Sequence, residues 1–131
     1  MHALLSIKPK YVEAIMSGEK EYEFRRSIFR NRGVEKAYIY ATSPIKKIVG
    51  AFKIGDIIED HPDNLWKQFK NSSGLNSREF FSYFNGCEAG FAIQIEDFEE
   101  FKKPLDPTCI IPSFTPPQSF YYLDSNMLSQ F

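Results

Sequence analysis

The sequence has few of the residues that build metal sites and disulfide frameworks. Its 131 residues include only two cysteines, Cys87 and Cys109, and two histidines, His2 and His61. None of the four has a second ligand at the spacing of a zinc motif, so we expect no bound metal and no cofactor. Two isolated thiols also suit a reducing compartment, which predicts a cytoplasmic protein.

Long apolar runs are missing as well. The chain enters Ala3–Ile7 without a basic leader or a cleavage site, and no run approaches the roughly 20 residues of a membrane helix. We therefore expect no membrane contact. The phosphate-binding glycine loop, the serine nucleophile elbow and the metalloprotease motif are also absent. The commonest enzyme signatures are thus excluded.

Charge is balanced overall but unevenly distributed. The net charge is −1, yet residues 1–55 hold 11 Lys and Arg against 5 Asp and Glu, whereas residues 56–131 hold 5 against 12. Such a chain can present a basic face to an anion without being basic as a whole. Its 13 Phe and 7 Tyr predict an interior filled by rings. At this length we expect one domain, residues 1–131.

Apolar periodicity predicts alternating strands and helices. A helix starting at Pro9 ends at Gly18, and Asn76 with Glu79 forms a capping box for a later helix. Gly50 and Gly55 interrupt a long strand, which is typical of bulges in a curling sheet. We expect an α+β fold with a curled, mostly antiparallel β-barrel and flanking helices. In chain order we expect strands at 2–7, 19–26, 34–42, 47–59 and 89–103, and helices at 9–17, 62–70 and 76–84.

The C-terminal part contains five prolines after residue 103, which exclude a long regular element. Pro116 and Pro117 can start a short helix that extends to Leu123. Phe114 and Phe120 make the segment too apolar for a free tail. We therefore expect residues 104–131 to wrap back over the barrel.

The best candidate site lies where the first helix passes into the second strand. Lys20, Glu23 and Arg25 offer a base, an acid and a fixed cation within six positions. Their side chains alternate with Tyr22 and Phe24, which predicts one core face and one charged face. Two interpretations remain open: a functional cluster, or a solvated strand face with weak ion pairs.

Further candidates surround this cluster. Lys8 and Lys10 flank the N-terminus of the first helix, where free backbone N–H groups can hold a phosphate. Arg26 adds a cation. Tyr40 can serve as a stacking platform for a base or, more simply, as a core residue. The predicted helix cap is enough to account for a glutamate at position 79, so Glu79 is not counted among the site residues.

The pattern Gly18-x-Lys20-x-x-Glu23-x-Arg25 resembles the ASCH domain family of the PUA-like superfamily, in particular small stand-alone bacterial members. Further similarity covers most of the chain, at residues 6–11, 40–44, 47–50 and 116–120. The resemblance implies a PUA-like barrel whose cleft, lined by Lys20, Glu23 and Arg25, binds RNA or a nucleotide-like ligand. A regulatory role fits such a binder.

Some ASCH relatives are enzymes, including amidohydrolases of acetylated cytidine and members reported to cleave RNA. Their lysine falls on Lys20, but the threonine three positions later is Glu23 here, so the hydroxyl nucleophile is missing. Lys20 and Glu23 remain candidates for a catalytic acid/base pair.

Three functions are therefore considered. The first is binding of RNA or a modified nucleotide, in which phosphates contact cations and unstacked bases contact rings. The second is hydrolysis of a modified nucleoside or RNA in the same cleft. The third is a protein-interaction module that uses the acidic residues 97–100 and the aromatic C-terminal segment.

Overall fold

The computed structural model of the protein describes residues 1–31, 33–118 and 120–123. In this part of the chain six strands form one mixed sheet with the order β2-β5-β4-β3-β1-β6. The β1–β3 pair is parallel and the other pairs are antiparallel. The elements are β1 (His2–Ile7), α1 (Pro9–Met16), β2 (Tyr22–Arg25), β3 (Lys36–Ala41), β4 (Lys47–Asp60), α2 (Pro62–Phe69), a 3₁₀ turn (Lys70–Ser72), α3 (Ser77–Tyr83), β5 (Gly90–Leu105), a second 3₁₀ turn (Pro107–Cys109) and β6 (Phe120–Leu123).

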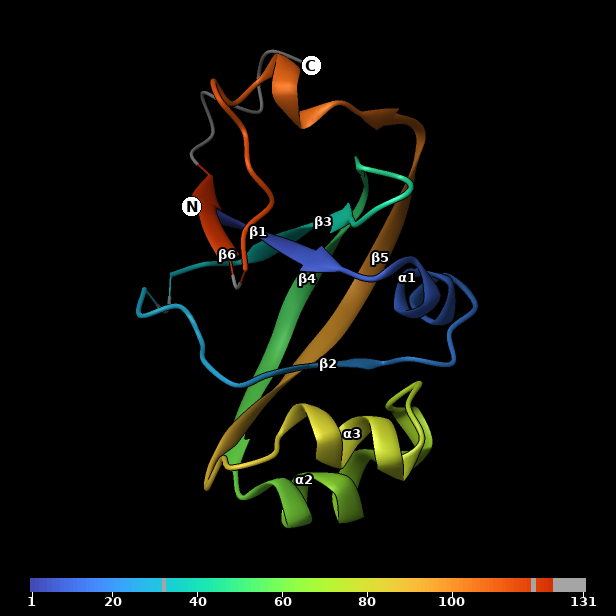
Figure 1. Ribbon diagram of the computed structural model, residues 1–131, viewed down its shortest axis with the longest axis vertical. Helices are drawn as coiled ribbons and strands as arrows, with labels where there is room; N and C mark the ends of the chain where they lie inside the picture. The colour runs from blue at the N-terminus through green and yellow to red at the C-terminus, as the bar shows by residue number, and fades with distance from the viewer. Residues whose placement is uncertain (32, 119, 124–131) are drawn as a thin grey trace.

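A long ribbon of β4 and β5 runs through the molecule, with α2 and α3 at one end and the C-terminal segment at the other (Figure 1). The expected bulges are confirmed, because the β4–β5 register shifts between Ile48 and Gly50 and between Ile54 and Ile57. At Gly50 a Cβ atom would lie 2.6 Å from the Glu99 carbonyl oxygen. Glycine is therefore needed there for the close approach of two backbones.

The predicted curled β-barrel is wrong, whereas the α+β class and the mostly antiparallel pairing are confirmed. In the described chain the sheet is open, with β2 and β6 as its two edges. Strands β1 to β5 were expected at about the right positions, but edge closure depends on pairing between distant strands, which local periodicity does not encode.

The C-terminal segment also differs from expectation. The short helix predicted from Pro116 to Leu123 is not formed, because Phe120–Leu123 is a strand that pairs antiparallel with β1. The unpaired backbone edge of β1 offers hydrogen bonds to a β-prone sequence, and this outweighs the proline start signal. Residues 124–131, the rest of the segment expected to wrap back, lie outside the described residues.

The core is divided between the faces of the sheet. One cluster joins α1 to the sheet through Val12 and Ile15, and another packs Phe24 of β2 against α2 and α3 through Leu65 and Phe80. A third cluster lies beneath the C-terminal segment, where Leu123 joins β1, β3 and β4. As a result, β2 lies between α1 on one side and the α2–α3 pair on the other.

Candidate functional site

A cleft of about 580 Å³ opens where the end of β1, the start of α1, β2 and α3 meet. Its walls include Ser6 and Lys8 from the β1–α1 junction, Arg26 from the end of β2, and Tyr83 from α3. Segments that are far apart in the sequence therefore form one concave surface. The predicted residues Lys8, Lys20, Glu23, Arg25 and Arg26 all line it.

Lys20, Glu23 and Arg25 form a buried ionic cluster on one side of this cleft. The Glu23 carboxylate lies 3.1 Å from Arg25 Nη1 and 3.6 Å from Lys20 Nζ. The exposed fractions of the three residues are 2% for Lys20, 7% for Glu23 and 9% for Arg25. The interpretation of this strand face as solvated is therefore wrong.

The burial follows from the position of β2. Phe24 points to the aromatic cluster of α3, with its ring centroid 5.1 Å from that of Phe80. The alternate residues Glu23 and Arg25 point the other way, and Arg25 Nη1 donates to the Ser6 carbonyl oxygen at 3.4 Å. The charged face thus meets the end of β1 instead of water.

The ammonium of Lys20 is almost fully enclosed. Its Nζ donates to the Ser73 carbonyl oxygen at 2.8 Å and lies 5.0 Å from the centre of the Phe24 ring and 5.7 Å from that of Tyr11. Burial lowers the pKa of Lys20, and the nearby Glu23 carboxylate opposes this shift. Among the charged side chains of the cleft, the Lys20 ammonium therefore contacts the Glu23 carboxylate, at 3.6 Å.

The connection between α2 and α3 holds Lys20 in place, a role that the sequence did not predict. The fully buried Ser73 donates its hydroxyl to the Lys70 carbonyl oxygen at 2.9 Å and accepts from the Leu75 N–H at 3.1 Å, and these bonds orient the Ser73 carbonyl toward Lys20. Ser72 accepts a further bond from the Glu21 N–H at 2.8 Å. The serines of this loop were the available signal, since they suit local backbone hydrogen bonds.

Gly74 offers a direct test of this loop. It has φ +67°, and an added Cβ would lie 2.8 Å from Lys20 Cβ. We expect Gly74→Ala to lower the free energy of unfolding by roughly 1–3 kcal/mol, from backbone strain and crowding together. Gly86→Ala is the matched control, because Gly86 has φ +81° with no atom within 4 Å of an added Cβ. Urea titrations giving equal losses for the two variants would show that contact with Lys20 contributes nothing.

Glu79 joins α3 to α1 across the rim of the cleft. The predicted capping box with Asn76 is confirmed, and the second carboxylate oxygen accepts from Lys10 Nζ at 2.7 Å and from the Tyr11 hydroxyl at 2.8 Å. These bonds lower the pKa of Glu79 to about 2, and burial together with the Glu79 carboxylate raises the pKa of Tyr11 to about 12. Lys10 is thus brought to the rim as the partner of Glu79.

The remaining predicted residues differ in their environments. Lys8 and Arg26 are exposed at the rim, and the Arg26 guanidinium lies 5.1 Å from the centre of the Tyr83 ring. Tyr40 does not line the cleft. It is buried in the cluster beneath the C-terminal segment, with its ring 5.1 Å from that of Phe114. The segment covers this face of β3, so Tyr40 is a core residue in this fold.

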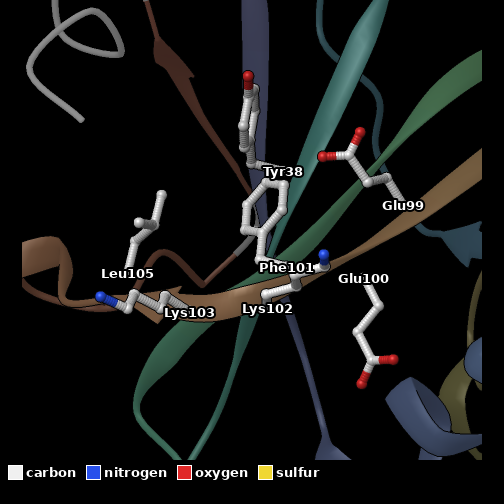
Figure 2. Close-up of a pocket in the computed structure, with 7 residues that line it drawn as sticks. All are labelled: Tyr38, Glu99, Glu100, Phe101, Lys102, Lys103 and Leu105. Carbon is white, nitrogen blue, oxygen red and sulfur yellow. The ribbon is translucent and has the colours of Figure 1, made fainter.

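A second hollow of about 580 Å³ lies on the sheet near the end of β5. Figure 2 shows the rings of Tyr38 and Phe101 side by side there, with Glu100 pointing away from them. Its charged residues are two carboxylates, Glu99 and Glu100, and two lysines, Lys102 and Lys103. This hollow lacks the net positive charge and the buried ionic cluster of the cleft.

Among the described residues, no group of three or more His, Cys, Asp or Glu side chains is arranged to hold a metal ion. In the same part of the chain no helix combines the length and apolarity needed to span a membrane.

The fold and the cleft define an α+β domain of the PUA-like class. Residues 4–114 match the family model described as a domain of unknown function, DUF365. The chain is 32% identical over 123 residues to an ASCH domain-containing ribonuclease of Zymomonas mobilis, an alignment that covers 92% of this chain and 83% of the relative. The chain belongs to the ASCH domain family.

Solved structures agree with this assignment. The crystal structure of ASCH from Zymomonas mobilis matches with a TM-score of 0.91 at 29% identity, over 98% of this chain and 92% of that one. The N-terminal domain of McrB from Staphylothermus marinus matches with a TM-score of 0.63 at 13% identity, over 98% and 91% of the two chains, and shares the fold alone.

Proposed function

We propose that the cleft binds an unpaired nucleotide of RNA. The observation that carries this proposal is the buried cluster of Lys20, Glu23 and Arg25 at its inner wall. Among the described lining residues, four cations (Lys8, Lys20, Arg25, Arg26) exceed two carboxylates (Glu23, Glu79). Since Glu79 is paired with Lys10, the field inside the cleft favours an anionic ligand.

The size of the cleft favours one nucleotide over a duplex. Its volume lies within the roughly 300–1,000 Å³ of ordinary small-molecule pockets. Lys8 and Arg26 at the rim are positioned for phosphate groups, and the Tyr83 ring provides an apolar surface for a base. Sequence-specific RNA binding generally uses such splayed-out bases. Glu23 and Arg25 then supply an acceptor and a planar donor for polar groups of the ligand.

The relatives support RNA as the ligand class. The curated relative from Zymomonas mobilis is named a ribonuclease, and its alignment covers most of both chains. A ribonuclease has to bind RNA before it cleaves it, so a binding site for RNA is the property that we propose the two chains share.

Salt dependence tests the proposed phosphate contacts. We expect affinity for a single-stranded oligoribonucleotide to fall steadily as salt rises, and the Lys8→Gln/Arg26→Gln variant to flatten the logarithmic slope by about 1.4, or about 0.7 per lost contact. Lys102→Gln/Lys103→Gln, in the second hollow, should keep the wild-type slope. The proposal is contradicted if the affinity for RNA does not change with salt. It is also contradicted if only the Lys102→Gln/Lys103→Gln variant changes the slope of log affinity against log salt concentration.

A second candidate function, cleavage of RNA in the same cleft, is favoured by the name of that relative. In this reaction Glu23 takes the proton of the attacking hydroxyl and returns it to the leaving oxygen, and the Lys20 ammonium, 3.6 Å away, stabilises the Glu23 carboxylate. We expect Glu23→Gln to reduce a cleavage rate by roughly 10²–10⁴-fold while RNA is still bound. Electrophoresis of labelled RNA checks this, and undiminished cleavage by the variant would remove Glu23 from the reaction.

A further inference from the structure

We infer that the inner end of the cleft holds a terminal phosphate, so that the protein prefers the phosphorylated end of an RNA to internal positions. This inference rests on the proposed function and specifies its ligand. It depends on three features of the cleft: two levels of positive charge, a buried hydroxyl that has no partner among the described residues, and a volume of about 580 Å³.

The cations of the cleft lie at two depths. Lys8 and Arg26 are exposed at the rim, whereas Arg25 is only 9% exposed and lies beside the Ser6 carbonyl oxygen. The Glu23 carboxylate contacts both the Arg25 guanidinium and the Lys20 ammonium, and so it fixes the orientation of Arg25. A charge placed at the inner level therefore meets a preorganised guanidinium, and the next phosphate along a chain reaches the rim.

The Ser6 hydroxyl belongs to this inner level. Ser6 lines the cleft, and its Oγ atom is buried with no hydrogen-bond partner among the described residues. A buried hydroxyl without a partner costs about 1–3 kcal/mol, so such groups are rare unless a ligand or water completes them. Contact with a ligand would therefore break no hydrogen bond between Oγ and the described residues. The hydroxyl can then donate to a phosphate oxygen.

A terminal phosphate suits this position better than an internal one. An internal phosphodiester is linked to nucleotides on both sides, and both would have to enter a cleft of about 580 Å³. A terminal monoester needs only one nucleotide in the cleft. It also carries about −1.5 to −2 charges at neutral pH, more than a diester, which strengthens its attraction to Arg25.

The test compares oligoribonucleotides of one sequence that differ only at their ends: a 5′-phosphate, a 3′-phosphate, hydroxyls at both ends, and a closed circle. Fluorescence anisotropy is measured with each. We expect at least one phosphorylated form to bind about tenfold or more tightly than the hydroxyl-ended form, and the circle to bind most weakly. The first two forms distinguish which end is recognised.

Two variants localise the effect. Ser6→Ala removes the hydroxyl but keeps the carbonyl that Arg25 contacts, and Arg25→Lys keeps the charge but loses the planar fork. Both should reduce the ratio of affinities for phosphorylated and hydroxyl-ended RNA several-fold. Ser17→Ala is the control, because the exposed Ser17 hydroxyl bonds to Ala14 outside the cleft. Melting temperatures show that each variant is folded.

The outcomes separate this inference from the proposed function. If hydroxyl-ended, phosphorylated and circular RNA bind equally, or if Ser6→Ala and Arg25→Lys keep the full wild-type ratio, the terminal-phosphate inference is wrong and RNA binding stands. If no RNA form binds at all, the proposed function itself fails and the inference fails with it.

Discussion

Replacing Glu23 by alanine is expected to lower the free energy of unfolding by about 3–5 kcal/mol, because it leaves two buried cations without the carboxylate between them. Glu23 is 7% exposed, and it contacts both Lys20 and Arg25. In an exposed pair the same change would cost only about 0–1 kcal/mol. The decrease in the free energy of unfolding therefore distinguishes a buried Glu23 carboxylate from an exposed one.

Glu21→Ala is the matched control for this variant. Glu21 precedes β2 and is exposed, and the hydrogen bonds that hold it in place use its backbone atoms, which the substitution keeps. We expect a change within about 0.5 kcal/mol for it. Urea unfolding of both proteins gives the comparison, and a loss below about 1 kcal/mol for Glu23→Ala would mean that the carboxylate is solvated after all.

Truncation of the chain after Ser113 is expected to lower the melting temperature by more than about 10 °C. It removes β6, which pairs with β1, and it uncovers the cluster of Leu4, Tyr40 and Ile48. Burial of each large apolar side chain contributes about 1.5–3 kcal/mol, so the total loss is several kcal/mol. Differential scanning calorimetry measures it.

Point variants within β6 check that the strand itself is responsible. Leu123 is 2% exposed, and Leu123→Ala should cost about 2–5 kcal/mol. Tyr122 is 40% exposed, and Tyr122→Phe removes only a hydroxyl that accepts from the Asn31 N–H, so a small effect is expected. If the truncated protein has the same melting temperature as the full-length chain, the described pairing of β6 with β1 is contradicted.

Local sequence patterns predicted most helices and strands, because the residues that encode a cap or a bulge lie only a few positions apart. The capping box of Asn76 and Glu79 and the bulges near Gly50 and Gly55 are of this kind. The alternation in β2 correctly separated Phe24 from Glu23 and Arg25. The alternation carries no information about which other segment covers the charged face. It therefore could not distinguish a solvated face from one that packs against β1 and α1.

The parts that escaped prediction depend on contacts between distant residues. Lys20 is held by Ser73, 53 positions later, and Lys10 meets Glu79 at a separation of 69. Tyr40 was a candidate for stacking because a strand pattern does not show which face a remote segment will cover. The open sheet and the strand β6 have the same origin, since edge pairing is decided by the whole fold.

The most direct test of the central claim is to map the amide chemical shifts of the protein by NMR while single-stranded RNA is added. The account predicts that the largest changes occur at the cleft, at Ser6, Lys8, Arg25 and Arg26, and that they weaken with salt. Changes centred instead on the second hollow around Tyr38 and Phe101, with the cleft unaffected, would contradict it.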